Sequence, residues 1–155
     1  MAIRRNKPYD LLLLMAVEFL VTVLVFYTAV IMLAQVYGST KDVILQNIGP
    51  GAFQIVYDDP VFALTVMGWL FGILAPATVL EIWGLYKAKR FSFYLGLMVS
   101  LMTTVVSIIA LLLFGFENLQ QTFRFALSAA LPLVAIYYLI KAPIQDYLMP
   151  SGRKG

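Results

Sequence analysis

The sequence predicts an all-α membrane protein with four transmembrane helices in an up-down bundle. Three observations support this: the composition, four long apolar stretches, and the distribution of basic residues between them. The 155 residues are 62% hydrophobic and only 12% charged, with a mean hydropathy of +0.89. A soluble domain is about half apolar and about a quarter charged, and a chain of this length has too little interior to bury the excess. The excess apolar surface must therefore face lipid.

Each of the four apolar stretches is long enough to cross a hydrocarbon layer, which takes about 20 helical residues. The expected spans cover residues 11–36, 61–86, 93–116 and 123–140. A cleavable signal peptide is the alternative for the first span, but its apolar run is longer than the roughly 7–15 residues of such a signal. We therefore expect residues 1–155 to form one four-helix transmembrane domain.

The start of the second span carries the clearest helix signal. Asp58 and Asp59 are favourable capping residues, and proline is tolerated at a helix start because it lacks an N–H that would be unpaired anyway. Asp58-Asp59-Pro60 therefore predicts a cap and a proline just ahead of the second span.

Basic residues fall mainly on one side of the predicted bundle. If the four spans alternate in direction, that side carries Arg4, Arg5, Lys7, Lys87, Lys89, Arg90, Lys141, Arg153 and Lys154. Only Lys41 and Arg124 fall on the other side. The positive-inside rule then predicts that both termini are cytoplasmic. The net charge of +3 is explained by topology and anionic headgroups, so no nucleic-acid partner is expected.

The longest connection, residues 38–60, is expected outside the cell. Ser39 can cap a short helix in which Val43 and Ile44 share an apolar face, and the Gly-Pro-Gly sequence at residues 49–51 would end it. This pattern predicts a short amphipathic helix that lies in the outer membrane interface.

Small residues recur at four-residue spacing in the second and third spans. Gly68 and Gly72 form a G-x-x-x-G pattern, and Gly96 and Ser100 form a similar one. Such spacing leaves a groove in which another helix can approach closely. We expect these two faces to pack against each other within the bundle. The alternative is that one of them docks a different protein.

Two carboxylates lie inside the apolar stretches, and both are expected near the cytoplasmic face. At 1.5 Å per residue, Glu18 lies about 10 Å deep and Glu81 about 9 Å deep. A carboxylate facing lipid without a partner costs a few kcal/mol, so both should face the interior or a partner. The neighbouring spans offer a cation at Lys141 and hydroxyl donors at Tyr86, Tyr94, Ser100, Tyr137 and Tyr138. This polar cluster either holds a proton or a cation, or fixes the helix register.

The chain contains no cysteine and no histidine. This excludes disulfides, thiol redox chemistry, zinc sites and the usual axial ligands of haem. No nucleotide motif or catalytic constellation is visible. No catalytic residue, metal site or cofactor is therefore predicted, bound lipids are the only ligands expected, and the protein is not expected to be an enzyme.

Two segments resemble recurrent features of small, uncharacterised four-helix membrane proteins of archaea and bacteria. They are GLYKAKRFSFYLGL at residues 84–97 and AIYYLIKAPIQDYL at residues 135–148. In those proteins a span ends in Gly-Leu-Trp or Gly-Leu-Tyr, a short basic turn follows, and the last helix ends before a basic residue, a proline and a closing amphipathic segment. Phe91-Ser92 stands here where Trp-Ala is more usual. The resemblance implies topology and no activity.

The sequence favours a non-catalytic accessory or structural subunit of a larger integral membrane complex, such as a respiratory or other energy-converting assembly. Its partners would be membrane lipids and other membrane subunits. The alternative is a small carrier or a lipid- or quinone-associated transport protein that uses Glu18 and Glu81. Both interpretations place the chain in the cell membrane as a multi-pass protein.

Overall fold

The structure is a computed structural model that describes residues 8–40, 42–44, 58–114 and 119–149. Its main helices are α1 (Tyr9–Gly38), α4 (Pro60–Tyr86), α5 (Arg90–Phe114), α6 (Leu119–Leu139) and α7 (Ala142–Leu148). None of the described residues lies in a strand. The first four helices are long and apolar enough to cross a membrane. The predicted multi-pass, all-α bundle is confirmed.

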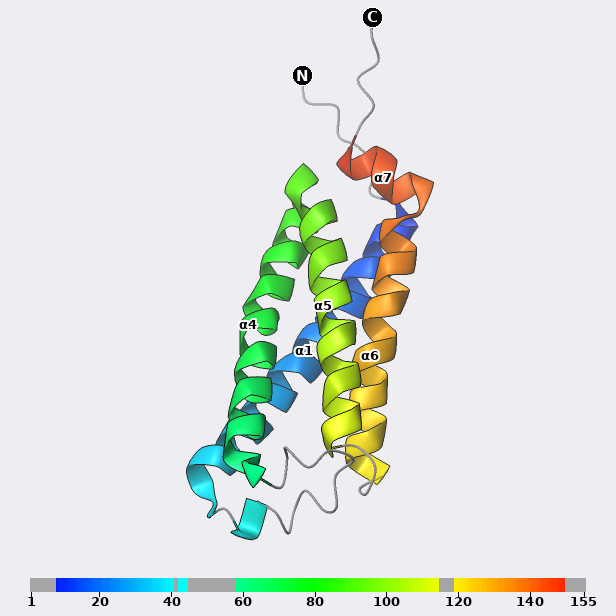
Figure 1. The fold of residues 1–155 in the computed structure, drawn as a ribbon. Helices are drawn as coiled ribbons and strands as arrows, with labels where there is room; N and C mark the ends of the chain where they lie inside the picture. Colours follow the sequence, from blue (N-terminus) through cyan, green and yellow to red (C-terminus); the bar gives the residue numbers. More distant parts are fainter. Residues whose placement is uncertain (1–7, 41, 45–57, 115–118, 150–155) are drawn as a thin grey trace, which may run out of the picture.

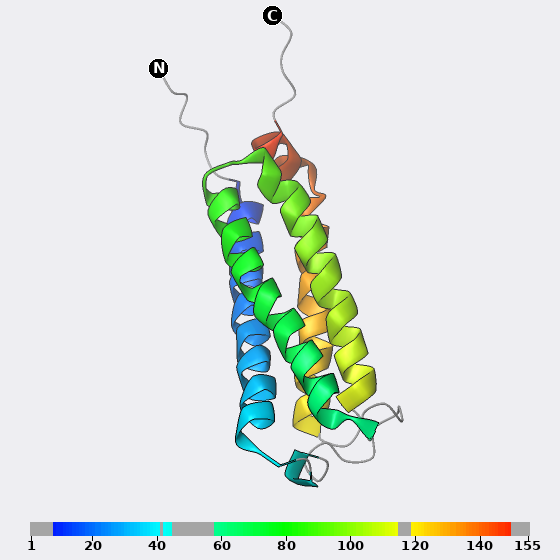
Figure 2. The same cartoon turned by 60° about the vertical axis from the view of Figure 1, so that its left-hand side comes forward.

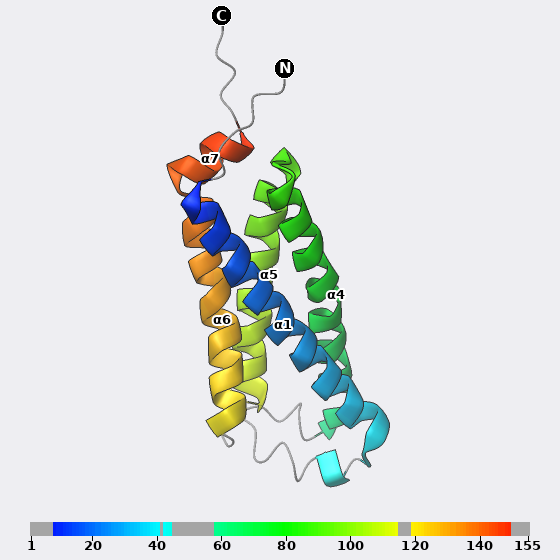
Figure 3. The same ribbon diagram turned by 180° about the vertical axis from the view of Figure 1, so that it is seen from behind.

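The four long helices form a closed ring in which neighbours run in opposite directions (Figures 1 and 2). Helices α1 and α5 each pack against both α4 and α6. Figure 3 shows that α1 runs obliquely, from α6 at the end of the bundle where α7 lies to α4 at the other end. The short helix α7 crosses that end and contacts α1, α5 and α6. It matches the closing segment that the sequence resemblance implied after the last span.

The helix that begins at Pro60 has the predicted cap. Asp59 Oδ1 accepts a hydrogen bond of 3.0 Å from the Phe62 N–H group, and Pro60 is the first residue of α4. The cap satisfies one of the N–H groups that a helix start leaves unpaired. The N-cap prediction is therefore confirmed.

A tight turn joins α4 to α5 and carries three basic residues. The Lys89 N–H group donates to the Gly84 carbonyl at 2.9 Å, and Ala88 has a φ of 51°. This is the left-handed conformation with which many helices end, usually at glycine. The turn places Lys87, Lys89 and Arg90 at the same end of the bundle as α7 (Figure 1).

Several sequence predictions fall mostly outside the described residues. Of the expected interfacial helix, only residues 42–44 are described; they are helical, and Ile44 is buried. The basic residues Arg4, Arg5 and Lys7 also lie outside the described part of the chain.

The predicted contact between the two small-residue faces is wrong. A Cβ atom added at Gly68 would lie 2.9 Å from Leu33 of α1, so Gly68 faces α1. At Gly72 an added Cβ would meet nothing within 4 Å. Gly96 faces Glu81 of α4 and Leu139 of α6. The oblique path of α1 explains the difference, because it brings α1 against the half of α4 farther from α7, and Gly68 belongs to that half.

The apolar core is divided into two clusters along the bundle. The smaller cluster lies next to α7 and includes Leu14 and Leu85, whereas the larger one begins at Val21 on α1 and fills the rest of the interior. A polar layer lies between the two clusters. Glu18 follows Leu14 by one helical turn and precedes Val21 by nearly one more, so it belongs to the same inward face.

Candidate functional site

Two carboxyl groups occupy the polar layer between the apolar clusters. Glu18 on α1 and Glu81 on α4 both have an exposed fraction of 0%. Glu81 lies four residues before Leu85 and three after Thr78, which are both buried on the same face of α4. Each carboxylate is therefore placed inside the bundle by the helical spacing of the core residues around it.

Three helices build the site. The carboxyl groups of Glu18 and Glu81 interact with each other across the α1–α4 interface. From α5, Ser100 Oγ donates a hydrogen bond to Glu18 Oε1 at 3.3 Å. Gly96, one turn away on α5, leaves the space that Glu81 occupies, because an added Cβ would collide with Glu81 Oε1.

Most of the carboxyl oxygens lack a hydrogen-bond partner. Glu18 Oε2 and both oxygens of Glu81 are buried, and none of them has a donor among the described residues. An ionised carboxylate only accepts hydrogen bonds, so two facing carboxylates cannot satisfy each other. Burying both charges would cost desolvation energy and add their mutual repulsion. One proton removes one charge and lets one carboxyl group donate to the other, so we expect the pair to hold a proton.

The other members of the predicted polar cluster gather around a different partner. Lys141 Nζ lies 3.0 Å from Asp10 Oδ1, and the two side chains are 31% and 26% exposed. The Lys141 ammonium also lies 4.6 Å from the ring centroid of Tyr138 and 5.1 Å from that of Tyr137. The hydrogen bond to Asp10 raises the pKa of Lys141 above its ordinary value. The structure therefore separates Lys141, Tyr137 and Tyr138 from the carboxyl pair.

Buried hydroxyl groups extend from the carboxyl pair toward the opposite end of the bundle. On α5, Ser100, Thr104 and Ser107 follow one another at helical spacing, and all three are buried. Thr104 Oγ1 donates to the Ser100 carbonyl at 2.9 Å. The hydroxyl groups without a partner among the described residues belong to Thr28, Thr103, Ser107 and Ser128.

Sequence reasoning missed two parts of this arrangement. It used the small residues of α5 as a packing surface and Ser100 as a donor near the carboxylates, but it did not extend these residues into a polar stripe on the inward face. It also overlooked Asp10, which lies in the first turn of α1 at the level where Lys141 ends the last span. An acidic residue at the start of one span, level with a basic residue at the end of another, is the signal that could have found this pair.

The site can hold a proton or a single small cation. Among the described residues there is no group of three or more histidine, cysteine, aspartate or glutamate side chains that could hold a metal ion. Two carboxylates and one serine hydroxyl offer only hard oxygen ligands, and too few of them for the 6–8 ligands, roughly, that calcium prefers. Proton binding is the simplest chemistry that these residues support.

No protein-family model, curated protein or solved structure matches this chain.

Proposed function

We propose that this protein is a small, non-enzymatic membrane carrier that binds a proton at the Glu18–Glu81 pair. The observation that carries the proposal is that two fully buried carboxyl groups interact with each other while only one further donor, Ser100, reaches them among the described residues. A carboxylate that only fixes helix register is expected to have its oxygens hydrogen-bonded, because an unpaired buried acceptor costs about 1–3 kcal/mol. A site that takes up and releases a proton must keep such oxygens available.

The position of the pair links proton binding to helix packing. Glu18 and Glu81 lie on the two facing helices α1 and α4. When the proton leaves, two negative charges face each other in a layer flanked by apolar clusters, and separation or hydration of the helices relieves the repulsion. The hydroxyl groups of α5 lie beyond the pair, where they can bind water or a cation in the hydrated state. These features support a carrier in which α1 and α4 move relative to each other.

Proton flux into lipid vesicles tests this function. Vesicles containing the full chain and a trapped pH-sensitive dye should equilibrate an imposed pH gradient faster than protein-free vesicles. Glu18→Gln and Glu81→Gln should each reduce the rate to that of protein-free vesicles. Asp10→Asn is the matched control, because it makes the same carboxyl-to-amide change in a different pair and should retain the flux. Wild-type flux no faster than the lipid background would refute the proposal, as would full flux in Glu81→Gln.

For the orientation, we propose that both termini are cytoplasmic. The basic turn at residues 87–90 and Lys141 lie at the end of the bundle next to α7, whereas Arg124 lies toward the other end. This distribution follows the positive-inside rule. A cysteine placed at Gln46 should be labelled only from outside the cell. Labelling from the cytoplasm would contradict the orientation.

A role as an accessory subunit of a larger membrane complex is the second candidate, and one observation favours it. A Cβ atom added at Gly72 would meet no atom of the described residues within 4 Å, and Gly72 lines an open groove of about 280 Å³ between α1 and α4. The other lining residues are Thr22, Phe26, Ala75, Pro76 and Val79. Small residues on such a surface allow a helix of another subunit to approach closely.

Substitutions at the two glycines of the G-x-x-x-G pattern distinguish docking of another subunit from packing within the bundle. Gly72→Leu should leave the isolated bundle intact but abolish co-migration with a larger complex after gentle detergent extraction. Gly68→Leu should instead destabilise the bundle itself, because the added side chain meets Leu33. If the wild-type protein migrates alone, or if Gly72→Leu co-migrates as the wild type does, this groove does not bind a subunit.

A further inference from the structure

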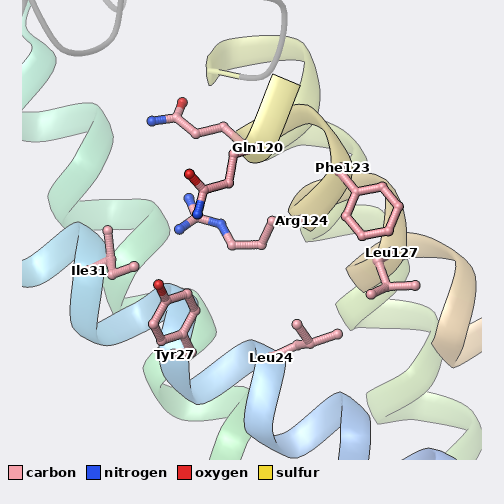
Figure 4. A pocket seen from close by; sticks show the side chains of 8 residues that line it. Leu24, Tyr27, Ile31, Gln120, Phe123, Arg124 and Leu127 are labelled. Atoms are coloured by element: carbon pink, nitrogen blue, oxygen red, sulfur yellow. The ribbon is translucent and has the colours of Figure 1, made fainter. Parts of the chain in front are cut away.

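A second groove lies at the end of the bundle opposite α7. It has a volume of about 360 Å³ and lies between α1 and α6. Its lining residues are Leu24, Tyr27, Ile31, Gln120, Gln121, Phe123, Arg124 and Leu127. Figure 4 shows Arg124 extending from α6 toward α1, with its guanidinium group near Tyr27.

Arg124 has no anionic partner in the described part of the chain. No ion pair to its guanidinium group is present among these residues, and its buried Nε atom has no hydrogen-bond acceptor there. The guanidinium carbon lies 4.8 Å from the ring centroid of the neighbouring Phe125. A positive charge within a membrane span is costly unless an anion or water compensates it. Among the described residues, the groove therefore holds no counter-ion for Arg124.

The polarity of the groove changes along its length. Gln120 and Gln121 lie in the first turn of α6, where the aligned peptide dipoles give the helix end a partial positive charge. Leu127 lies about 10 Å further along the helix, at 1.5 Å per residue, and faces the same groove as Leu24 of α1. One end of the groove thus suits an anion at headgroup depth, and the other suits a hydrocarbon chain.

We propose that this groove binds one anionic phospholipid, with its phosphodiester on Arg124 and an acyl chain along Leu24 and Leu127. A guanidinium group can donate two parallel hydrogen bonds to phosphate oxygens, which supplies the missing counter-ion. The Gln side chains and the α6 N-terminus add donors for the headgroup. The apolar end of the groove distinguishes a lipid from free phosphate, and the positive charge of Arg124 favours an anionic lipid over a zwitterionic one.

Native mass spectrometry of the full chain in detergent tests the site. Added phosphatidylglycerol should give one retained lipid adduct, with weaker retention of phosphatidylcholine. Arg124→Gln should weaken the adduct about tenfold or more, because a hydrogen bond to a charged group is lost. Arg90→Gln is the matched control, because it removes an arginine from the other end of the bundle and should retain the adduct. Equal retention in Arg124→Gln and the wild type would overturn the proposal.

A second variant separates a lipid from a free anion and does not depend on Arg124. Leu24→Trp fills the apolar half of the groove and leaves the guanidinium group in place, so it should weaken the phosphatidylglycerol adduct. Inorganic phosphate should bind neither protein with comparable affinity. If phosphate competes with phosphatidylglycerol at equal concentration, or if Leu24→Trp retains the lipid fully, the groove binds an anion rather than a lipid. Neither measurement involves Glu18 or Glu81, so the lipid site can be disproved while the proposed carrier function stands.

Discussion

Two pairs of ionisable side chains lie toward the same end of the bundle and differ in almost every respect. Lys141 and Asp10 carry opposite charges, join at 3.0 Å and are partly exposed. Glu18 and Glu81 carry like groups, are fully buried, and accept one hydrogen bond from another described residue, Ser100. The satisfied pair is thus at the surface, where it stabilises little. The pair of like groups is in the core, where burial of polar groups costs the most folding free energy.

This contrast indicates what each pair contributes. An exposed pair of opposite charges can be lost with small effect, and here it attaches the start of α1 to the beginning of α7. A buried pair of like groups lowers stability, so its presence is better explained by an activity that requires it. Substitutions in the two pairs should therefore change stability in opposite directions.

The largest effect is expected from Glu81→Met. Methionine keeps the length of the side chain and removes a buried polar group that lacks donors among the described residues. Replacement of a whole buried ion pair by apolar groups of similar volume is often neutral or stabilising by about 1–4 kcal/mol, and here the substitution also removes the repulsion between two like groups. We expect a higher midpoint of thermal unfolding in detergent and no proton flux. A lower midpoint would mean that Glu81 is structural and would remove the contrast between the two pairs.

Gly96→Ala should have the next largest effect, in the opposite direction. Alanine is normally favoured over glycine inside a helix by about 1 kcal/mol. Here the added methyl group would displace the Glu81 carboxyl group and press on Leu139, and overpacking of this kind costs about 1–3 kcal/mol. Thermal unfolding should show a net destabilisation. The double variant Gly96→Ala/Glu81→Ala, which removes the displaced side chain, should recover part of it.

Ser100→Ala tests how much the hydrogen bond from α5 stabilises the buried pair. It removes the hydrogen bond to Glu18 Oε1 and should cost about 1 kcal/mol of unfolding free energy. Ser107→Ala is the matched control, because Ser107 lies on the same face of α5 and its hydroxyl has no partner among the described residues. Equal losses in the two variants would show that the bond at Ser100 contributes nothing.

The sequence predicts the fold well for a physical reason. A membrane imposes a length and an apolar composition on each span, so the four helices and the cap at Asp59 follow from local residues alone. The burial of Glu18 and Glu81 at one level also follows, because exposure of a carboxylate to lipid is costly. The helix rotations and crossing angles do not follow from local sequence.

The failed predictions share this cause. The partner of Gly68 depends on the oblique path of α1, and that path results from packing over the whole bundle. The separation of Lys141 from Glu81 depends on where α6 ends and α7 begins, which decides that Asp10 is the nearer carboxylate. Long-range geometry of this kind has no signature in hydrophobic periodicity, which reports only the inward face of each helix.

Lys141→Gln is expected to have the smallest effect, and its pH dependence identifies the cause. Because Asp10 raises the pKa of Lys141 in the folded protein, the pair stabilises the fold below the ordinary lysine pKa of about 10.4 and ceases to do so as the pH rises above the folded value. The variant should therefore unfold at a slightly lower temperature than the wild type at neutral pH, and the two should converge in strongly alkaline buffer. High salt at neutral pH should narrow the same gap, since both side chains are partly exposed. A gap that persists under both conditions would come from lost contacts with the Tyr137 and Tyr138 rings rather than from the ion pair.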